Sequence, residues 1–268
     1  ELGGEGCGWA TAITMWFELS VMLLVIKRPW LLDTGLLDQF DWPSFDPINS
    51  IFRVGVPIGL TLFLEMTVFA LISLLVGSIG VTAIGANTIA GNLNWFVFVI
   101  PMSIGSAASI RVGFYVGAKD YQAAAQVARL TIYVSAAYAF FAFAVLIMGR
   151  DVFPKIYSSD PEVVALTSDL LLIVACYQLF DCTQATLIGI LRGYKDTKIP
   201  MFISWSGYWL LALPVGLVLG WGLLGPDWGV LGFWVGLGLG VAWIAGFALL
   251  RVIQTSKNIE RIEQFAAV

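Results

Sequence analysis

The sequence predicts an all-α polytopic membrane protein with seven transmembrane helices. Hydrophobic residues make up 59% of the 268 residues and charged residues only 12%, whereas soluble domains carry roughly 25% charged residues. Seven apolar runs are each long enough to cross a hydrocarbon core of about 30 Å at about 1.5 Å per helical residue. Lys and Arg gather in alternate connecting segments, which is the third observation that favours this class.

The seven runs are separated by polar or glycine-rich segments. They cover residues 6–26, 50–76, 81–104, 127–148, 163–191, 199–219 and 230–250. The first run is followed by the longest hydrophilic stretch, residues 28–49, which predicts a linker between two membrane bundles. The connector 111–129 contains Asp120 as the expected N-cap of the fourth run, and Asp160 followed by proline predicts the start of the fifth.

The basic residues give an expected orientation. Twelve lie in one alternating set of connectors or beside it: Lys27, Arg28, Arg53, Arg111, Lys119, Arg129, Arg192, Lys195, Lys198, Arg251, Lys257 and Arg261. The other set contains only Arg150 and Lys155. Because short cytoplasmic loops are enriched in Lys and Arg, the linker and the C-terminus are expected in the cytoplasm.

Asp181 is a carboxylate near the middle of the fifth run. Tyr177, Asp181 and Gln184 occur at i, i+4 and i+7, so they share one helix face. A carboxylate in the centre of a membrane helix costs about 2.5–3.5 kcal/mol on insertion scales. Two interpretations stay open: a polar clamp between helices, or an ion or proton site, which is the default for an intramembrane acid.

Polar residues also line up in the second and third runs. Thr61 and Glu65 are i, i+4 neighbours, which places a hydroxyl and a second mid-membrane carboxylate on one face. Asn87, Gly91 and Asn94 follow the same spacing in the third run. Membrane asparagines often bond neighbouring helices, so packing and cavity lining are both retained for them.

Several enzyme classes lack their residues here. The chain has no histidine, which removes zinc-protease motifs and Ser-His constellations. The Gly236-Leu237-Gly238-Leu239-Gly240 pattern lies inside an apolar run, so it indicates close helix packing rather than a phosphate-binding loop. No enzymatic activity, resident cofactor or nucleic-acid partner is expected.

Four segments in order resemble the multidrug and toxic-compound extrusion (MATE) family, most closely its NorM-type branch. They are GWATAITMW at 8–16, FRVGVPIGLTLFLE at 52–65, IPMSIGSAASIRVGFYVGAKD at 100–120 and GILRGYKDTKIP at 189–200. One departure is the Ala86-Asn87 pair, where many members carry His-Gln. The match extends along nearly the whole chain.

The resemblance implies a place for each part in a twelve-helix, two-lobe transporter. Residues 1–27 would be the sixth helix, which ends the N-terminal lobe, and residues 28–49 the cytoplasmic inter-lobe linker. Residues 50–250 would form the six-helix C-terminal lobe and residues 251–268 a cytoplasmic tail. The missing N-terminal lobe would then be the partner of this chain, in the bacterial inner (plasma) membrane.

The resemblance also implies a function, namely secondary active multidrug efflux by alternating access. The family's C-lobe acids implicated in cation coupling match Glu65 and Asp181, and its tyrosine one turn before the second acid matches Tyr177. The coupling ion would be Na⁺ or H⁺, with Na⁺ held by Glu65 and Asp181. Substrates would be amphiphilic organic cations, and the cavity-lining candidates are Thr61, Asn87, Asn94 and Gln184.

Two other functions compete with this one. A flippase for lipid-linked or polyanionic substrates, as in the wider superfamily, would need a cationic cavity, yet no Lys or Arg lies near the middle of a run. A membrane scaffold without transport would tolerate neutral residues in place of Glu65 and Asp181.

Overall fold

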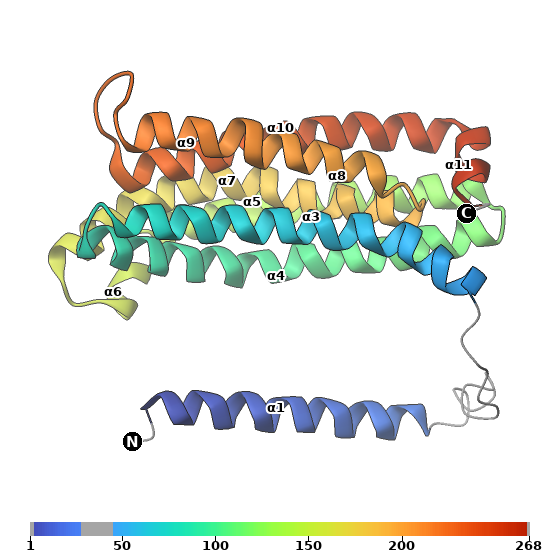
Figure 1. Ribbon diagram of the computed structural model, residues 1–268, viewed down its shortest axis with the longest axis horizontal. Helices are drawn as coiled ribbons and strands as arrows, with labels where there is room; N and C mark the ends of the chain where they lie inside the picture. The colour runs from blue at the N-terminus through green and yellow to red at the C-terminus, as the bar shows by residue number, and fades with distance from the viewer. Residues whose placement is uncertain (1–2, 28–44, 267–268) are drawn as a thin grey trace. The chain divides into compact units, whose positions relative to one another are not determined.

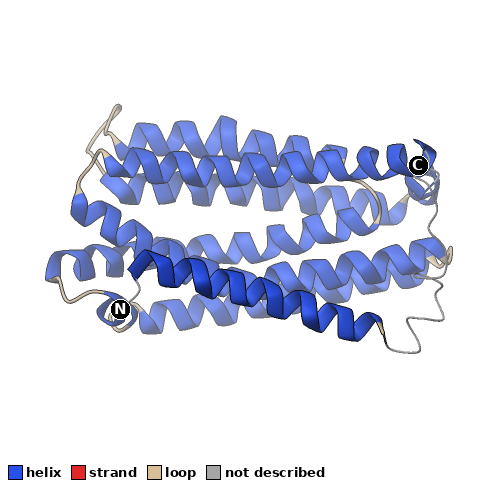
Figure 2. Cartoon of the chain, turned by 60° about the horizontal axis from the view of Figure 1, so that its bottom comes forward, coloured by secondary structure: helices blue, strands red, loops and turns tan. Residues whose placement is uncertain are grey.

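The computed structural model describes residues 3–27 and 45–266, and over these it contains helices and connecting loops but no strands (Figure 2). The chain separates into two compact units, Glu1–Ile48 and Asn49–Val268. The described part of the first unit holds α1 (Gly3–Ile26), an apolar helix of 24 residues, and residues 45–48, where the next helix begins. The predicted linker lies mostly outside the described residues.

The second unit is a bundle of long helices (Figure 1). Its elements are α3 (Phe45–Gly77), α4 (Val81–Gly117), α5 (Tyr121–Gly149), α6 (Phe153–Tyr157), α7 (Pro161–Gly193), α8 (Lys198–Trp205), the π-helical segment η1 (Ser206–Ala212), α9 (Leu213–Gly220), α10 (Gly229–Lys257) and α11 (Ile259–Ala266). With α8, η1 and α9 forming one span, seven described segments are long and apolar enough to cross a membrane. The predicted count is confirmed.

The helices extend beyond the apolar runs, so the connector predicted over 111–129 is mostly helical. α4 continues to Gly117, and α5 begins at Tyr121. Hydropathy identifies only the apolar part of a helix. The helix itself can continue into polar sequence where the polar side chains of its last turns have hydrogen-bond partners. Arg111 finds such a partner inside α4, because its guanidinium donates to the Tyr115 hydroxyl at 3.3 Å and lies 5.4 Å from that ring's centroid.

The same effect lengthens the last span. α10 runs seven residues past the expected end at 250, to Lys257, and α11 follows after Asn258. Ile262 of α11 is buried in an apolar cluster with residues of α4, α5 and α7. In Figure 1, α11 lies at one end of the bundle and α6 at the other.

The helix starts predicted at Asp120 and Asp160 are confirmed. The Asp120 carboxylate accepts a hydrogen bond from the backbone N–H of Ala123 at 2.9 Å. The Asp160 carboxylate accepts one from the backbone N–H of Glu162 at 2.9 Å, with Pro161 in the first turn. Each carboxylate pairs a backbone donor that a helix start otherwise leaves unsatisfied.

Two helix ends share one geometry. Lys119 after α4 and Lys195 after α7 both have φ of 59°, in the left-handed region. The next residue, Asp120 or Asp196, donates its N–H to a carbonyl five residues back, Tyr115 or Leu191 respectively, at 2.9 Å. This is the Schellman helix ending. The G-x-K-D sequences therefore encode the same turn twice.

Glycines bring helix backbones into contact, as predicted for Gly236 and Gly240, whereas nothing lies within 4 Å of a methyl group on Gly238. A methyl group on Gly236 would lie 2.5 Å from the backbone nitrogen of Gly216, and one on Gly240 would lie 2.5 Å from the Gly207 carbonyl oxygen. Between α4 and α7, a methyl group on Gly105 would lie 2.8 Å from the carbonyl oxygen of Ala185. Small residues thus permit the approach of α10 to η1 and α9, and of α4 to α7.

α7 is the central helix, packed closely against α4, α5 and α10. Its buried residues include Leu170, Leu171 and Val174. The backbone of α3 approaches its neighbours at fewer points. α3 turns one face inward, which carries Thr61, Glu65, Val68, Ile72 and Val76.

Candidate functional site

Four helices of the bundle surround a pocket of about 370 Å³. α3 contributes Glu65, α7 contributes Tyr177 and Asp181, and α4 contributes Asn87 and Asn94. Its apolar wall includes Phe69, Trp95, Phe98 and Trp234. The structure therefore brings together both mid-membrane acids, the tyrosine and both asparagines named from the sequence.

Glu65 is 8% exposed and its carboxylate is held from a neighbouring span. The hydroxyl of Tyr208, in η1, donates to Oε1 of Glu65 at 3.0 Å. The next residue of η1, Trp209, donates its indole N–H to the Leu64 carbonyl at 3.3 Å. Two consecutive residues of η1 thus bond two consecutive residues of α3.

Asp181 has a different environment. It is 1% exposed, and its Oδ1 has no hydrogen-bond partner among the described residues. Tyr177, one turn earlier on α7, is also buried and meets Trp234 edge to face with ring centroids 5.8 Å apart. Asp181 and Glu65 line the same pocket. A buried carboxylate oxygen without a donor is costly, so a cation or a proton in the pocket would stabilise it.

The two asparagines line the pocket and also bond helices. Oδ1 of Asn87 accepts the indole N–H of Trp234 at 3.0 Å. Oδ1 of Asn94 accepts from Nε2 of Gln178 at 2.9 Å, and the same nitrogen donates to the Asn94 carbonyl at 3.1 Å. Packing and lining, the two interpretations of these residues, are therefore compatible.

Thr61 and Gln184 are buried but do not line this pocket. The Thr61 hydroxyl donates to the Pro57 carbonyl at 2.8 Å, within its own helix. Oε1 of Gln184 is buried with no partner among the described residues. The expectation that they line a transport cavity stays a prediction.

The pocket offers oxygen ligands, which hard cations prefer. They are the carboxylates of Glu65 and Asp181, the Tyr177 hydroxyl and the amide oxygens of the two asparagines. Among residues 3–27 and 45–266, no group of three or more His, Cys, Asp or Glu side chains is placed to hold a metal ion.

Four residues of this site were not identified from the sequence: Gln178, Tyr208, Trp209 and Trp234. Each bonds a residue at least 84 positions away. Three of them are aromatic residues in apolar runs, which normally indicate packing. Only the hydroxyl or indole N–H of each, which needs a hydrogen-bond acceptor when buried, could have indicated a place in the site. Tyr208 is 0% exposed, and a buried phenol needs an acceptor.

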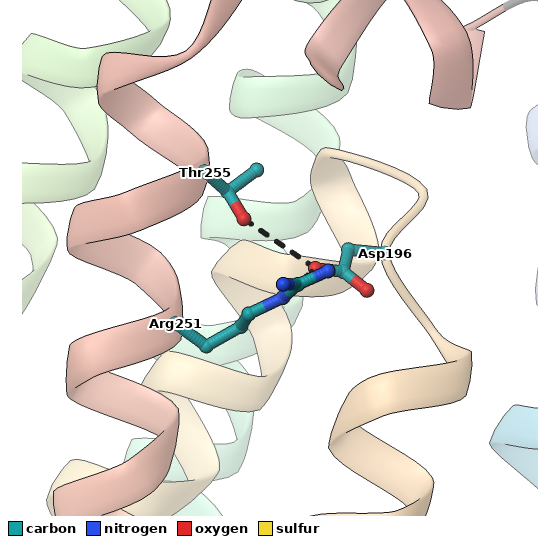
Figure 3. Close-up of polar contacts among 3 residues, drawn as sticks. All are labelled: Asp196, Arg251 and Thr255. Atoms are coloured by element: carbon teal, nitrogen blue, oxygen red, sulfur yellow. Dashed lines mark hydrogen bonds and ion pairs between the residues drawn. The ribbon is translucent and has the colours of Figure 1, made fainter.

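A second polar cluster lies toward the α11 end of the bundle. Figure 3 shows Arg251 of α10 reaching the carboxylate of Asp196, in the turn between α7 and α8. The Arg251 Nε is 2.6 Å from Oδ2 of Asp196, and the Thr255 hydroxyl donates to the same oxygen at 3.4 Å. This pair ties the turn to α10, although the sequence placed Arg251 in a polar tail.

Comparison with known proteins finds relatives that match along nearly the whole chain. The chain is 34% identical over 265 residues to the probable multidrug resistance protein NorM of Idiomarina loihiensis, a match that covers 97% of this chain and 57% of that protein. It is 38% identical over 257 residues to the multidrug resistance protein MdtK of Yersinia pestis, covering 94% and 55% respectively. The chain thus spans about half the length of the curated relatives it matches.

Solved structures show the same fold. The eukaryotic MATE transporter AtDTX14 matches with a TM-score of 0.82 and 23% identity, over 94% of this chain and 56% of that one. The Vibrio cholerae MATE transporter VcmN in the bent form matches with a TM-score of 0.71 and 17% identity, over 80% and 48%. The MatE family model matches residues 57–218, more than half of the chain. The chain therefore belongs to the MatE family.

Proposed function

We propose that this chain contributes the cation-coupled half of a multidrug efflux transporter. In this proposal Na⁺ or H⁺ drives antiport of amphiphilic organic cations by alternating access. The observation that carries it is the pair of buried carboxylates, Glu65 and Asp181, on one pocket with aromatic walls. The curated relatives are themselves named multidrug resistance proteins.

The two carboxylates supply a reason for ion binding. Charged groups out of water strongly favour neutralisation, and two neighbouring acids reinforce this. Glu65 already accepts a hydrogen bond from Tyr208, whereas Oδ1 of Asp181 has no described donor. A cation or proton that enters the pocket would therefore stabilise the Asp181 side most.

Coupling requires that ion and substrate favour different conformations. A ligand shifts a conformational equilibrium only through its different affinities for the two states. α3 is suited to such a shift, because its backbone makes fewer close approaches than that of α7 and it carries Pro57 within the helix. In the ion-bound state Glu65 and Asp181 would be neutralised together, and substrate would favour the other state.

The pocket chemistry favours cationic substrates. Among the described residues, its lining contains two acids, several aromatic rings and no Lys or Arg, and aromatic faces attract organic cations. A flippase for polyanionic substrates would need positive charge at this position. The pocket therefore gives no support to the flippase alternative.

The assembly and orientation belong to the same proposal. Residues 1–27 would complete a partner lobe, residues 28–49 would link the lobes, and residues 50–250 would form the C-terminal lobe with a cytoplasmic tail at 251–268. In the bacterial inner membrane, the basic α11 end would face the cytoplasm and the α6 end the outside.

The test is efflux of ethidium from cells that express the longest open reading frame containing this chain. Na⁺ and proton gradients are imposed separately, with wild type beside Asp181→Asn and Glu65→Gln. We expect one of the two gradients to drive efflux in the wild type. In both variants the efflux rate driven by that gradient should be at least tenfold lower than in the wild type.

Asp169→Asn is the matched control, because Asp169 is an exposed acid on the same helix, outside the pocket. It should transport like the wild type. Gradient-driven efflux that survives at full rate in both Asp181→Asn and Glu65→Gln would assign coupling to residues other than these two acids. A normally expressed wild type that shows no efflux under either gradient would support the scaffold alternative.

A further inference from the structure

The sixth span is interrupted by a π-helical segment at the level of the pocket. η1 covers Ser206–Ala212, between α8 and α9. π-helical turns are rare, and they occur frequently at functional sites because the extra residue in the turn redirects side chains. Pro214 follows η1 and has no N–H to donate to the carbonyl four residues before it, so an ordinary α-helical bond is absent there.

η1 packs against α10 on one side and bonds α3 on the other. A methyl group on Gly207 would lie 2.8 Å from the Gly240 carbonyl oxygen, so this backbone rests directly on α10. From that fixed backbone, the next two side chains, Tyr208 and Trp209, reach α3.

The bonds that η1 makes are directed at the proposed coupling acid. Tyr208 donates to the carboxylate of Glu65 itself, and Trp209 donates to the carbonyl of the preceding residue, Leu64. Tyr208 is fully buried and meets the Phe69 ring edge to face with centroids 6.5 Å apart. One hydrogen bond thus fixes the carboxylate, and the second fixes the backbone that carries it.

We propose that Tyr208 is a positioning residue for Glu65, and that η1 holds the α3 carboxylate in place at the pocket. This inference rests on the proposed function, in which Glu65 helps to bind the coupling ion. A preorganised ligand binds an ion more tightly than one that must first be ordered. Without the Tyr208 hydroxyl, the Glu65 side chain loses its described donor and adopts other rotamers.

The first test uses cells that express the longest open reading frame containing this chain. It measures the ion concentration that gives half-maximal efflux and the maximal efflux rate. Tyr208→Phe keeps the ring and removes only the hydroxyl. We expect the half-maximal ion concentration to rise roughly tenfold, as for loss of a hydrogen bond to a charged group, with the maximal rate within twofold of wild type.

Tyr138→Phe is the matched control. Its hydroxyl donates to a backbone carbonyl, that of Val97, at 2.9 Å, and neither residue lines the acidic pocket. This control removes a tyrosine hydrogen bond inside the bundle without touching Glu65. A half-maximal ion concentration unchanged in Tyr208→Phe, or raised equally in Tyr138→Phe, would overturn the inference.

A second measurement separates this inference from the proposed function. Thermal unfolding of the purified chain is compared for wild type, Tyr208→Phe, Glu65→Leu and the double variant. We expect Tyr208→Phe to lower the unfolding temperature only where Glu65 is present. If the effect of Tyr208→Phe on stability depends on Glu65 but Glu65→Gln transports normally, the contact is real and Glu65 has no role in ion coupling. If the effects of the two changes on the unfolding temperature are additive, Tyr208 does not position Glu65.

Discussion

Nε of Arg251 lies 2.6 Å from Oδ2 of Asp196, and the Asp196 side chain is only 2% exposed while that of Arg251 is 16% exposed. The pair joins a turn and a helix that are 55 residues apart in the chain. Arg251 also lies 6.0 Å from the centroid of the Phe265 ring in α11. A single guanidinium therefore connects the α7–α8 turn, α10 and the last helix.

Arg251→Leu should destabilise the chain strongly. It leaves the Asp196 carboxylate buried with only the Thr255 hydroxyl as a described side-chain partner. Removing one partner of a buried ion pair costs about 3–5 kcal/mol. We expect a clear loss of thermal stability in detergent, while Asp196→Asn, which removes the charge but keeps hydrogen-bonding atoms, should cost less.

Arg150→Leu is the comparison for this prediction. Its ion pair with Asp151 is open to solvent, with side chains 40% and 69% exposed, and such pairs contribute about 0–1 kcal/mol. Equal losses for Arg150→Leu and Arg251→Leu would show that the buried pair has no special role in stability.

Much of this bundle could be predicted from the sequence, because hydropathy and capping are local. The seven spans and the starts at Asp120 and Asp160 follow from a few neighbouring residues each. The placement of Glu65 and Asp181 in two different spans was equally plain. That both line one pocket depends on helix rotation and packing, which helical spacing alone does not determine.

The parts that could not be predicted depend on contacts across the bundle. η1 has the composition of an ordinary apolar helix, and Tyr208 finds its partner 143 residues away. Arg251 was assigned to a tail because arginine normally ends a membrane span. A helix continues past such a residue when a buried acid, here Asp196, is available to pair with it.

Gln178 and Gln184 provide a comparison on one helix. Gln178 is fully buried and its amide donates twice to Asn94, so Gln178→Leu should cost about 1–2 kcal/mol. Oε1 of Gln184 has no described partner, so Gln184→Leu should be neutral or stabilising. Thermal unfolding of the purified variants tests both.

Efflux measurements on the same two variants test the lining role predicted for Gln184. If Gln184→Leu is stable yet transports a narrower range of cations, that residue contacts substrate in a state other than the one described. A Gln184→Leu variant less stable than Gln178→Leu would contradict the assignment of their hydrogen bonds.

Lys119→Gly should stabilise the turn between α4 and α5. Lys119 has φ of 59°, a conformation that costs a residue with a side chain about 1–2 kcal/mol and costs glycine almost nothing. The change should raise the free energy of unfolding by up to about 1 kcal/mol. Ala118→Gly, next to it with φ of −76°, should lower it, and a stability loss in both would contradict the turn geometry.

Gly236 and Gly238 lie two residues apart on α10 but face different surroundings. A methyl group on Gly236 would meet the backbone nitrogen of Gly216 at 2.5 Å, whereas nothing lies within 4 Å of one on Gly238. Because backbone atoms cannot move aside as a side chain can, Gly236→Ala must separate α9 from α10, at a cost of about 1–3 kcal/mol or more. Gly238→Ala should instead gain about 0.5–1 kcal/mol from better helix propensity.

Thermal unfolding of the two alanine variants in the same detergent decides this comparison. The expected order of unfolding temperatures is Gly238→Ala, then wild type, then Gly236→Ala. The contact also predicts a functional effect, since displacement of α10 moves Trp234, which bonds Asn87 at the pocket. Gly236→Ala should therefore reduce efflux as well as stability, and a Gly236→Ala protein as stable and active as Gly238→Ala would mean that α9 and α10 do not pack backbone to backbone.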